Sequence, residues 1–185
     1  MLEKYAPYNI IQKIIAEDSP FTIREIARKA EVGTGTAKQW CDFLIHEGIL
    51  QKKIIGKRNV LLEKNLEDIR LRYIKILFSL DTVQKSGLVN EIRRVCPLIL
   101  SIILYGSVAR GEDDSKSDID ILIISRKPVH KELLRLKAQE KLEKEVTFTA
   151  CSMQEWREKA KKDKVFYDQI ILEGIALFGD KVMVS

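Results

Sequence analysis

Two strongly apolar stretches in the middle of the chain constrain its fold more than any other feature. Residues 98–105 read Leu-Ile-Leu-Ser-Ile-Ile-Leu-Tyr, and residues 118–124 read Asp-Ile-Asp-Ile-Leu-Ile-Ile. The first stretch is rich in β-branched residues and apolar almost throughout, which is typical of a strand that is buried on both faces. The second predicts a strand that begins with two carboxylates. We therefore expect two core strands with polar chemistry at their ends.

The first predicted strand ends at Gly106 and Ser107. A glycine at a strand end allows the backbone to come close to a ligand. Backbone amides that open a short helix directly afterwards form a cradle for phosphate groups. The residues after the first strand are therefore candidates for phosphate binding.

The second predicted strand carries Asp118 and Asp120 two positions apart. Side chains alternate along a strand, so the two carboxylates lie on one face with α-carbons roughly 6.5–7 Å apart. Two such charges repel each other by roughly 3 kcal/mol at an effective dielectric constant of about 20. This arrangement favours a cation, and hard oxygen ligands select Mg²⁺ or Mn²⁺. Two such ions activate an attacking oxygen and stabilise a leaving pyrophosphate.

Either piece alone is consistent with an ordinary loop or a polar strand end. Together, the strand, Gly106-Ser107, residues 108–117 and then Asp118-Ile119-Asp120 closely resemble the polymerase-β-like nucleotidyltransferase superfamily. The fuller string over residues 106–111 with residues 117–120 is similar to its minimal branch. This resemblance covers most of residues 66–185 and implies a short mixed sheet with helices packed on it.

The resemblance also implies roles for individual residues. Gly106 and Ser107 would hold a nucleoside triphosphate, with ATP the expected one, and Asp118 and Asp120 would bind two Mg²⁺ ions. The reaction would transfer a nucleoside monophosphate to an acceptor hydroxyl and release pyrophosphate. Arg110 would contact a phosphate or the acceptor, or would instead pair with the acidic residues 112–114 that follow it.

The family has a third acidic residue on a neighbouring strand, which acts as a metal ligand and general base. After a predicted helix over residues 129–143, the expected strand at residues 145–151 has threonines in its interior. Glu145 is the only acidic residue close to this position, and the alternative is that it is simply solvated. Without a general base, which is typically worth about 10²–10⁴ in rate, the domain would be a slow enzyme or a nucleotide-binding module.

The first 65 residues have a different pattern. Apolar residues recur at helical spacing in three segments between residues 8 and 47, with a break at residues 32–35 before the third. Thr22 and Glu25 form a predicted capping box for the second helix. Two extended segments, residues 49–55 and 60–62, flank a turn at residues 56–59. This order resembles the winged helix-turn-helix family, so the expected fold class is α+β, with domains at residues 1–65 and 66–185.

If the resemblance holds, the third helix enters the major groove of double-stranded DNA and the hairpin contacts phosphates. The predicted DNA-facing residues are Thr36, Lys38, Gln39 and Asp42 on the helix, and Lys52, Lys53, Lys57 and Arg58 on the hairpin. The alternative is that residues 1–65 bind another protein or pair two subunits as a homodimer. The net charge of +5 permits DNA binding without establishing it.

The rest of the chain supports a packed cytoplasmic protein. The longest apolar stretch, residues 97–105, is far shorter than the roughly 20 residues that span a bilayer. Three scattered cysteines and two histidines predict buried reduced thiols and argue against a zinc site. Further helices are predicted over residues 66–80, 83–95, 152–156 and 166–173, with a short strand at residues 175–178.

Two functional hypotheses follow. In the first, the chain is a Mg²⁺-dependent nucleotidyltransferase that modifies a protein or nucleic acid, with its N-terminal domain binding DNA or selecting the target. In the second, it is a DNA-binding transcriptional regulator whose nucleotidyltransferase-like domain only binds nucleotide.

Overall fold

The computed structural model describes residues 5–55, 59–96, 98–129 and 136–184. Contacts divide the chain into an N-terminal unit, residues 1–75, and a C-terminal unit, residues 76–185. This division falls within helix α4 (Ile69–Ser86), whereas the predicted boundary follows residue 65. Each unit has its own apolar core.

The N-terminal unit consists of helices followed by a hairpin in its described part. The elements are α1 (Ala6–Ala16), α2 (Ile23–Lys29), α3 (Thr34–His46), β1 (Leu50–Ile55) and β2 (Asn59–Lys64), with the two strands antiparallel. Ile10, Ile26 and Leu44 from the three helices meet Leu50 and Leu62 from the hairpin in one buried cluster. The helical stripes of the sequence therefore face a common core.

The ends of α2 and α3 follow from local chemistry. Thr22 accepts a hydrogen bond from the Glu25 amide while the Glu25 side chain accepts one from the Thr22 amide, which confirms the predicted capping box. The break before α3 is shorter than predicted, because Gly33 is the N-cap and Thr34 already begins the helix.

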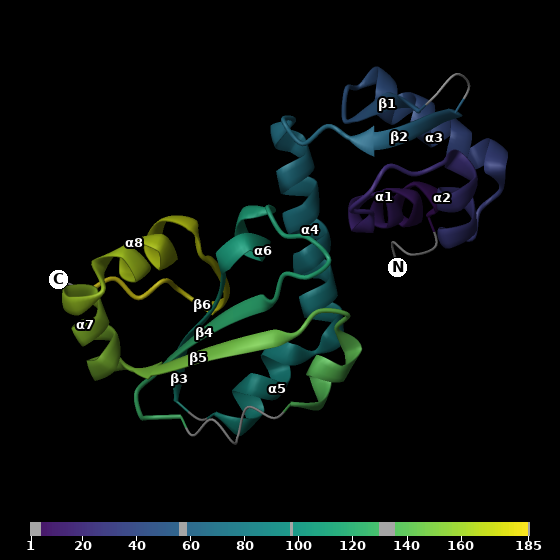
Figure 1. Cartoon of the computed structure of the whole chain (residues 1–185). Coiled ribbons are helices and arrows are strands. Elements are labelled where there is room, and N and C mark those ends of the chain that lie inside the picture. The colour runs from purple at the N-terminus through teal and green to yellow at the C-terminus, as the bar shows by residue number, and fades with distance from the viewer. Residues whose placement is uncertain (1–4, 56–58, 97, 130–135, 185) are drawn as a thin grey trace. The chain divides into compact units, whose positions relative to one another are not determined.

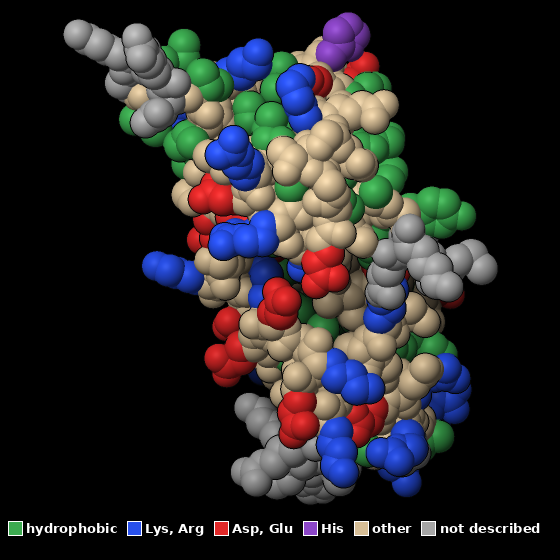
Figure 2. Space-filling model, turned by 90° about the vertical axis from the view of Figure 1, so that its right-hand side faces the viewer, with side chains coloured by type: hydrophobic (Ala, Val, Ile, Leu, Met, Phe, Trp, Pro, Cys, Tyr) green, Lys and Arg blue, Asp and Glu red, His purple; other side chains and the backbone are tan. Residues whose placement is uncertain are grey.

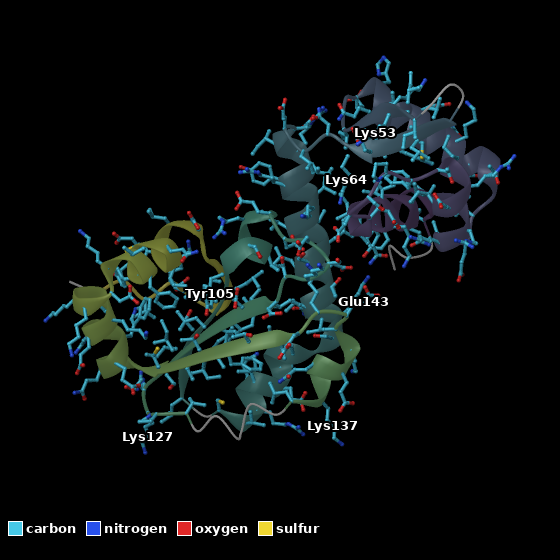
Figure 3. All side chains as sticks on the ribbon, viewed as in Figure 1. Lys53, Lys64, Tyr105, Lys127, Lys137 and Glu143 are labelled. Carbon is cyan, nitrogen blue, oxygen red and sulfur yellow. The ribbon has the colours of Figure 1, made fainter. Side chains whose placement is uncertain are left out.

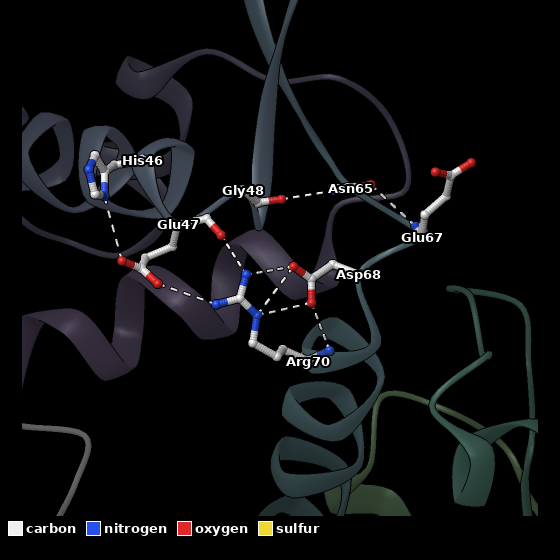
Figure 4. Close-up of polar contacts among 7 residues, drawn as sticks. All are labelled: His46, Glu47, Gly48, Asn65, Glu67, Asp68 and Arg70. Atoms are coloured by element: carbon white, nitrogen blue, oxygen red, sulfur yellow. Dashed lines mark hydrogen bonds and ion pairs between the residues drawn. The ribbon is translucent and has the colours of Figure 1, made fainter.

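A polar network joins the end of α3 to the start of α4 (Figure 4). The Arg70 guanidinium donates to both Asp68 oxygens, pairs with the Glu47 carboxylate at 3.3 Å and donates to the Glu47 carbonyl. The Asp68 side chain also accepts from the Arg70 amide at 2.8 Å. The Asn65 amide group donates to the Gly48 carbonyl at 2.9 Å. These bonds hold the chain where it leaves the hairpin.

The C-terminal unit is built on a sheet in the order β5-β4-β3-β6 (Figure 1). Its strands are β3 (Ile99–Tyr105), β4 (Ile119–Ser125), β5 (Val146–Ser152) and β6 (Ile175–Gly179). The β4–β5 pair is parallel and the other two pairs are antiparallel. This is a small mixed sheet with flanking helices, as predicted.

Side chains of β4 divide the core into two layers. Ile119, Ile121 and Ile123 pack with α5 (Leu88–Val95) and the 3-10 helix η3 (Lys137–Lys141). Leu122 and Ile124 point to the opposite face, where they pack with α7 (Met153–Lys162) and α8 (Lys164–Glu173). Because alternate residues are buried on opposite sides, both faces of β4 are apolar for most of its length.

Two predicted helices have different boundaries in the structure. The helices expected over residues 66–80 and 83–95 are instead α4 and α5, which meet at Gly87 with a φ of +80°. The Ser86 hydroxyl donates to the Val83 carbonyl and accepts from the Leu88 amide, so it ends one helix and begins the next. The positive φ of Gly87, which favours glycine, decides where the break falls.

The helix predicted over residues 129–143 is wrong in its described part. Residues 137–141 form the short 3-10 helix η3, which ends before Leu142, and residues 130–135 lie outside the described residues. Leu136, Ala138 and Leu142 are buried against the sheet, so tertiary packing determines this short turn.

Cys41, Cys96 and Cys151 are free and buried, as predicted. Burial raises the pKa of the Cys41 thiol to about 11. In the part of the chain that the structure describes, none of the helices is long and apolar enough to span a membrane.

Candidate functional site

A glycine corner connects β3 to the short helix α6 (Gly106–Arg110). Gly106 has a φ of +75°, and a Cβ added to it would lie 2.3 Å from Asp120 Oδ2. Such a distance is far below van der Waals contact, so only glycine fits here without movement of the carboxylate. The backbone at this corner therefore lies close to the Asp120 carboxylate, and its approach to a ligand stays a prediction.

The two predicted metal ligands lie at the start of β4. Asp118 directly precedes the strand and is exposed, whereas Asp120 is partly buried and is paired with Tyr105 on β3 and Thr147 on β5. Asp120 has the same strand parity as Leu122, so it points to the α7–α8 face of the sheet. The i, i+2 spacing places Asp118 on that same side.

The electrostatics of this pair favour a cation. Burial, and then the neighbouring charge of Asp118, raise the pKa of the Asp120 carboxyl above its usual range. A divalent ion relieves both effects, and carboxylate oxygens are the donors that Mg²⁺ prefers. The donor chemistry of Asp118 and Asp120 therefore fits such an ion, which these two carboxylates would hold.

The loop before β4 is ordered by its own side chains. Asp114 Oδ1 accepts from the Lys116 amide at 3.0 Å and from the Ser117 hydroxyl at 2.8 Å. Lys144, which lies just before β5, contacts the Asp113 carboxylate and the Asp114 carbonyl. These contacts hold the segment that leads into Asp118, and sequence reasoning did not identify Lys144 as part of the site.

Glu145 directly precedes β5, and its backbone carbonyl accepts from the Ile119 amide at 2.8 Å. Its side chain is exposed and has the same parity as Thr147, so it lies on the Asp120 side of the sheet. Among the described residues, no three His, Cys, Asp or Glu side chains form a group that could hold a metal. The role of Glu145 as third ligand and base stays a prediction.

Two hydroxyl groups next to Asp120 were missed by sequence reasoning. Tyr105 and Thr149 hydroxyls lie 3.0 Å apart, and the Tyr105 ring packs edge-on against Phe166 with centroids 5.5 Å apart. Figure 3 shows Tyr105 at the end of the sheet. Only the register, which brings β3 and β5 to opposite sides of β4, places these side chains together. The one available signal is that Tyr105 directly precedes Gly106.

Arg110 is paired with carboxylates. Its guanidinium Nε lies 2.8 Å from Glu112 and its Nη1 lies 3.2 Å from Glu173. The pairing with Glu112 is the alternative that the sequence left open, and Glu173 at the end of α8 was not anticipated. A contact between Arg110 and a phosphate requires it to exchange one of these partners. Ser107 lies in α6, where its carbonyl accepts from the Glu112 amide.

The structure describes some, but not all, of the residues predicted to face DNA. Thr36, Gln39 and Lys52 are exposed, as expected for contact residues. Lys38 pairs with Asp42 at 2.5 Å and Lys53 pairs with Glu63 at 2.8 Å, so one predicted groove residue and one predicted phosphate contact are partly neutralised.

Lys57 and Arg58 lie outside the described residues. Figure 2 shows basic and acidic side chains interspersed over the face in view.

Comparison with known proteins finds a family similarity within the C-terminal unit. The family model described as nucleotidyltransferase domain matches residues 85–173, just under half of the chain. The matched segment contains the Gly106 corner and both aspartates. Residues 85–173 are therefore similar to a nucleotidyltransferase domain. Comparison with the curated proteins gives no match.

Similar solved structures have low identity and low TM-scores. A toxin–antitoxin structure with AMP-PNP is 22% identical over 51% of this chain and 73% of that chain, with a TM-score of 0.39. A mutant of the toxin–antitoxin MntA-HpeT is 19% identical over 54% of this chain and 74% of that chain, at 0.40. A putative nucleotidyltransferase from Sulfolobus solfataricus is 18% identical over 65% of this chain and 100% of that chain, at 0.39.

The glycine corner yields a test with a matched control. We expect Gly106→Ala to lower the free energy of unfolding more than Gly87→Ala, because both residues have a positive φ but a Cβ at Gly87 has no atom within 4 Å. Backbone strain of this kind costs about 1–3 kcal/mol, and Gly106 adds the clash with Asp120. Urea unfolding of the full chain measures both. Equal losses would show that the Asp120 contact contributes nothing.

Proposed function

We propose that the chain is a Mg²⁺- or Mn²⁺-dependent nucleotidyltransferase that moves a nucleoside monophosphate from a nucleoside triphosphate, with ATP the expected one, to a protein or nucleic-acid acceptor. The observation that carries this proposal is the contact of the Asp120 carboxylate with the side-chain-free corner at Gly106. It is supported by the nucleotidyltransferase family match over the same residues.

Each group at the corner has a proposed part. Asp118 and Asp120 hold the divalent ion, which when bound neutralises phosphate charge and activates the α-phosphate for attack. Gly106 and Ser107 present backbone amides to the terminal phosphates. Arg110, once released from a carboxylate, stabilises negative charge on the phosphates.

The proton of the acceptor hydroxyl needs a base. Glu145 is the proposed one, because Thr147 and Thr149 on the neighbouring strand have hydroxyls that do not ionise near neutral pH. Glu145 is exposed, so its proposed action requires the acceptor to approach from the solvent side of β5. This arrangement is consistent with a macromolecular acceptor.

The carboxylate pair is tested by labelling with ATP that carries a radioactive α-phosphate, in the presence of Mg²⁺. We expect the full chain to label itself or an added acceptor, and Asp118→Asn or Asp120→Asn to reduce labelling to background. Asp180→Asn, an exposed aspartate after β6, serves as the control and keeps full labelling. Equal labelling by the wild type and Asp118→Asn would refute the proposal.

The proposed base gives a separate test. We expect Glu145→Gln to slow transfer by about 10²–10⁴, because general-base help is typically worth that much. Calorimetric titration should show that ATP binding with Mg²⁺ is unchanged in this variant. An unchanged transfer rate would exclude Glu145 as the base.

For the N-terminal unit, we propose a winged-helix domain that binds double-stranded DNA, which would serve either a targeted enzyme or a nucleotide-sensing regulator. The order of three helices and a hairpin in the described residues, with exposed Thr36 and Gln39 on α3, supports it. On binding, Lys38 and Lys53 would exchange their carboxylate partners for DNA phosphates.

Fluorescence anisotropy with duplex DNA tests this domain. We expect affinity to fall steeply with salt and Lys52→Ala to weaken it, whereas Lys161→Ala on α7 leaves it unchanged. Absence of duplex binding at low salt would overturn the DNA role. It would favour protein contact through apolar residues such as Phe43, which is 50% exposed on α3.

A further inference from the structure

A pocket of about 340 Å³ lies against α5 and η3 in the C-terminal unit. Its charged and polar lining consists of Asn90, Glu91 and Arg94 from α5, and Lys137 and Lys141 from η3. Three cations and one carboxylate therefore meet in a volume at the lower end of the range for small-ligand sites.

The carboxylate in this pocket is already used by the fold. Glu91 Oε2 accepts from the Ala138 amide at 2.7 Å, and Oε1 accepts from the Lys137 amide at 3.3 Å and lies 3.6 Å from Arg94. Glu91 thus attaches η3 to α5, and both of its oxygens face donors of the protein. It is poorly placed to neutralise the two lysines as well.

In the part of the chain that the structure describes, the side chains of Lys137 and Lys141 have no carboxylate partner. Within residues 136–184 and the other described segments, no ion pair involves Lys137 or Lys141. This contrasts with Lys38, Lys53, Lys85, Lys144 and Arg110, which all pair with acids. The pocket therefore brings together two lysines that no described carboxylate neutralises.

The two elements that line the pocket are anchored in the same apolar core. Leu88 and Ile92 on α5 are completely buried, and Ala138 on η3 is 4% exposed in the same core cluster. The Ser86 hydroxyl accepts a hydrogen bond from the Leu88 amide at the start of α5. Ser86 and Gly87 also line the pocket, so the N-terminus of α5, where the helix dipole is positive, lies beside it. The cations project from elements that cannot move apart without opening the core.

The pocket is distinct from the carboxylate site. Its helices pack on the Ile119 and Ile121 face of the sheet, whereas Asp120 points to the opposite face. Figure 3 shows Lys137 well away from Tyr105, which pairs with Asp120 in the sheet.

We propose that this pocket binds a small, multiply charged anion with two or more linked phosphate groups. Such a ligand offers acceptor oxygens to Arg94, Lys137 and Lys141 together, and charge-assisted hydrogen bonds of this kind are the strong ones. Asn90 adds a neutral donor at the rim. The proposal does not depend on nucleotidyl transfer, because none of these residues takes part in it.

Calorimetric titration of the full chain with inorganic pyrophosphate, in EDTA to exclude divalent ions, tests the proposal. We expect saturable binding that Lys137→Gln and Lys141→Gln each weaken about tenfold, since one charge-assisted contact is lost. Lys161→Gln, which removes an exposed lysine on α7, is the matched control and should change the affinity less than twofold.

Further arms identify the source of the phosphate group. ATP binding that competes with pyrophosphate would extend the site to nucleotides, and pyrophosphate binding without ATP competition would assign it to inorganic anions; both support the proposal.

Amide NMR shifts should be confined to α5 and η3, and Asp118→Asn should leave them unchanged. Absence of saturable binding, an equal loss in Lys161→Gln, equal binding of adenosine, or shifts centred on Gly106 would overturn it.

Discussion

The close approach of Gly106 to the Asp120 carboxylate is the contact on which the proposed chemistry of this chain depends. A Cβ at this position would lie 2.3 Å from Asp120 Oδ2, and the φ of +75° turns the chain directly from β3 into α6. One residue therefore creates the turn and allows the Asp120 carboxylate to lie directly against the backbone at the start of α6. A side chain there would disturb the backbone and the carboxylate together.

The position of β4 in the sheet explains how the Asp118 and Asp120 carboxylates can lie beside an apolar core. Isoleucines on one face are buried under α5 and η3, while Leu122 and Ile124 on the other are buried under α7 and α8. Asp118 and Asp120 lie at the start of this alternating pattern, where the side chains are not fully buried. The apolar part of the strand thus holds the two acids in register without contributing to their chemistry.

Ion pairing separates the basic residues of the chain into two groups. Arg110, Lys38 and Lys53 look equally available in the sequence, but each lies against a carboxylate in the structure. Lys137 and Lys141 have no such partner in the described part of the chain and face one pocket together. Because desolvated or unpaired charge is what attracts an anion, pairing is a better guide to binding than the number of basic residues.

Local patterns were sufficient for the features that depend on neighbouring residues. The two core strands, the glycine corner, the Thr22–Glu25 capping box and the shared face of Asp118 and Asp120 all follow from spacing of four residues or fewer. The 3-10 form of residues 137–141, the Tyr105–Thr149 contact and the pairing of Arg110 with Glu173 did not. Each depends on packing or strand register between segments distant in sequence, and such contacts acquire their energy only when the sheet brings those segments together.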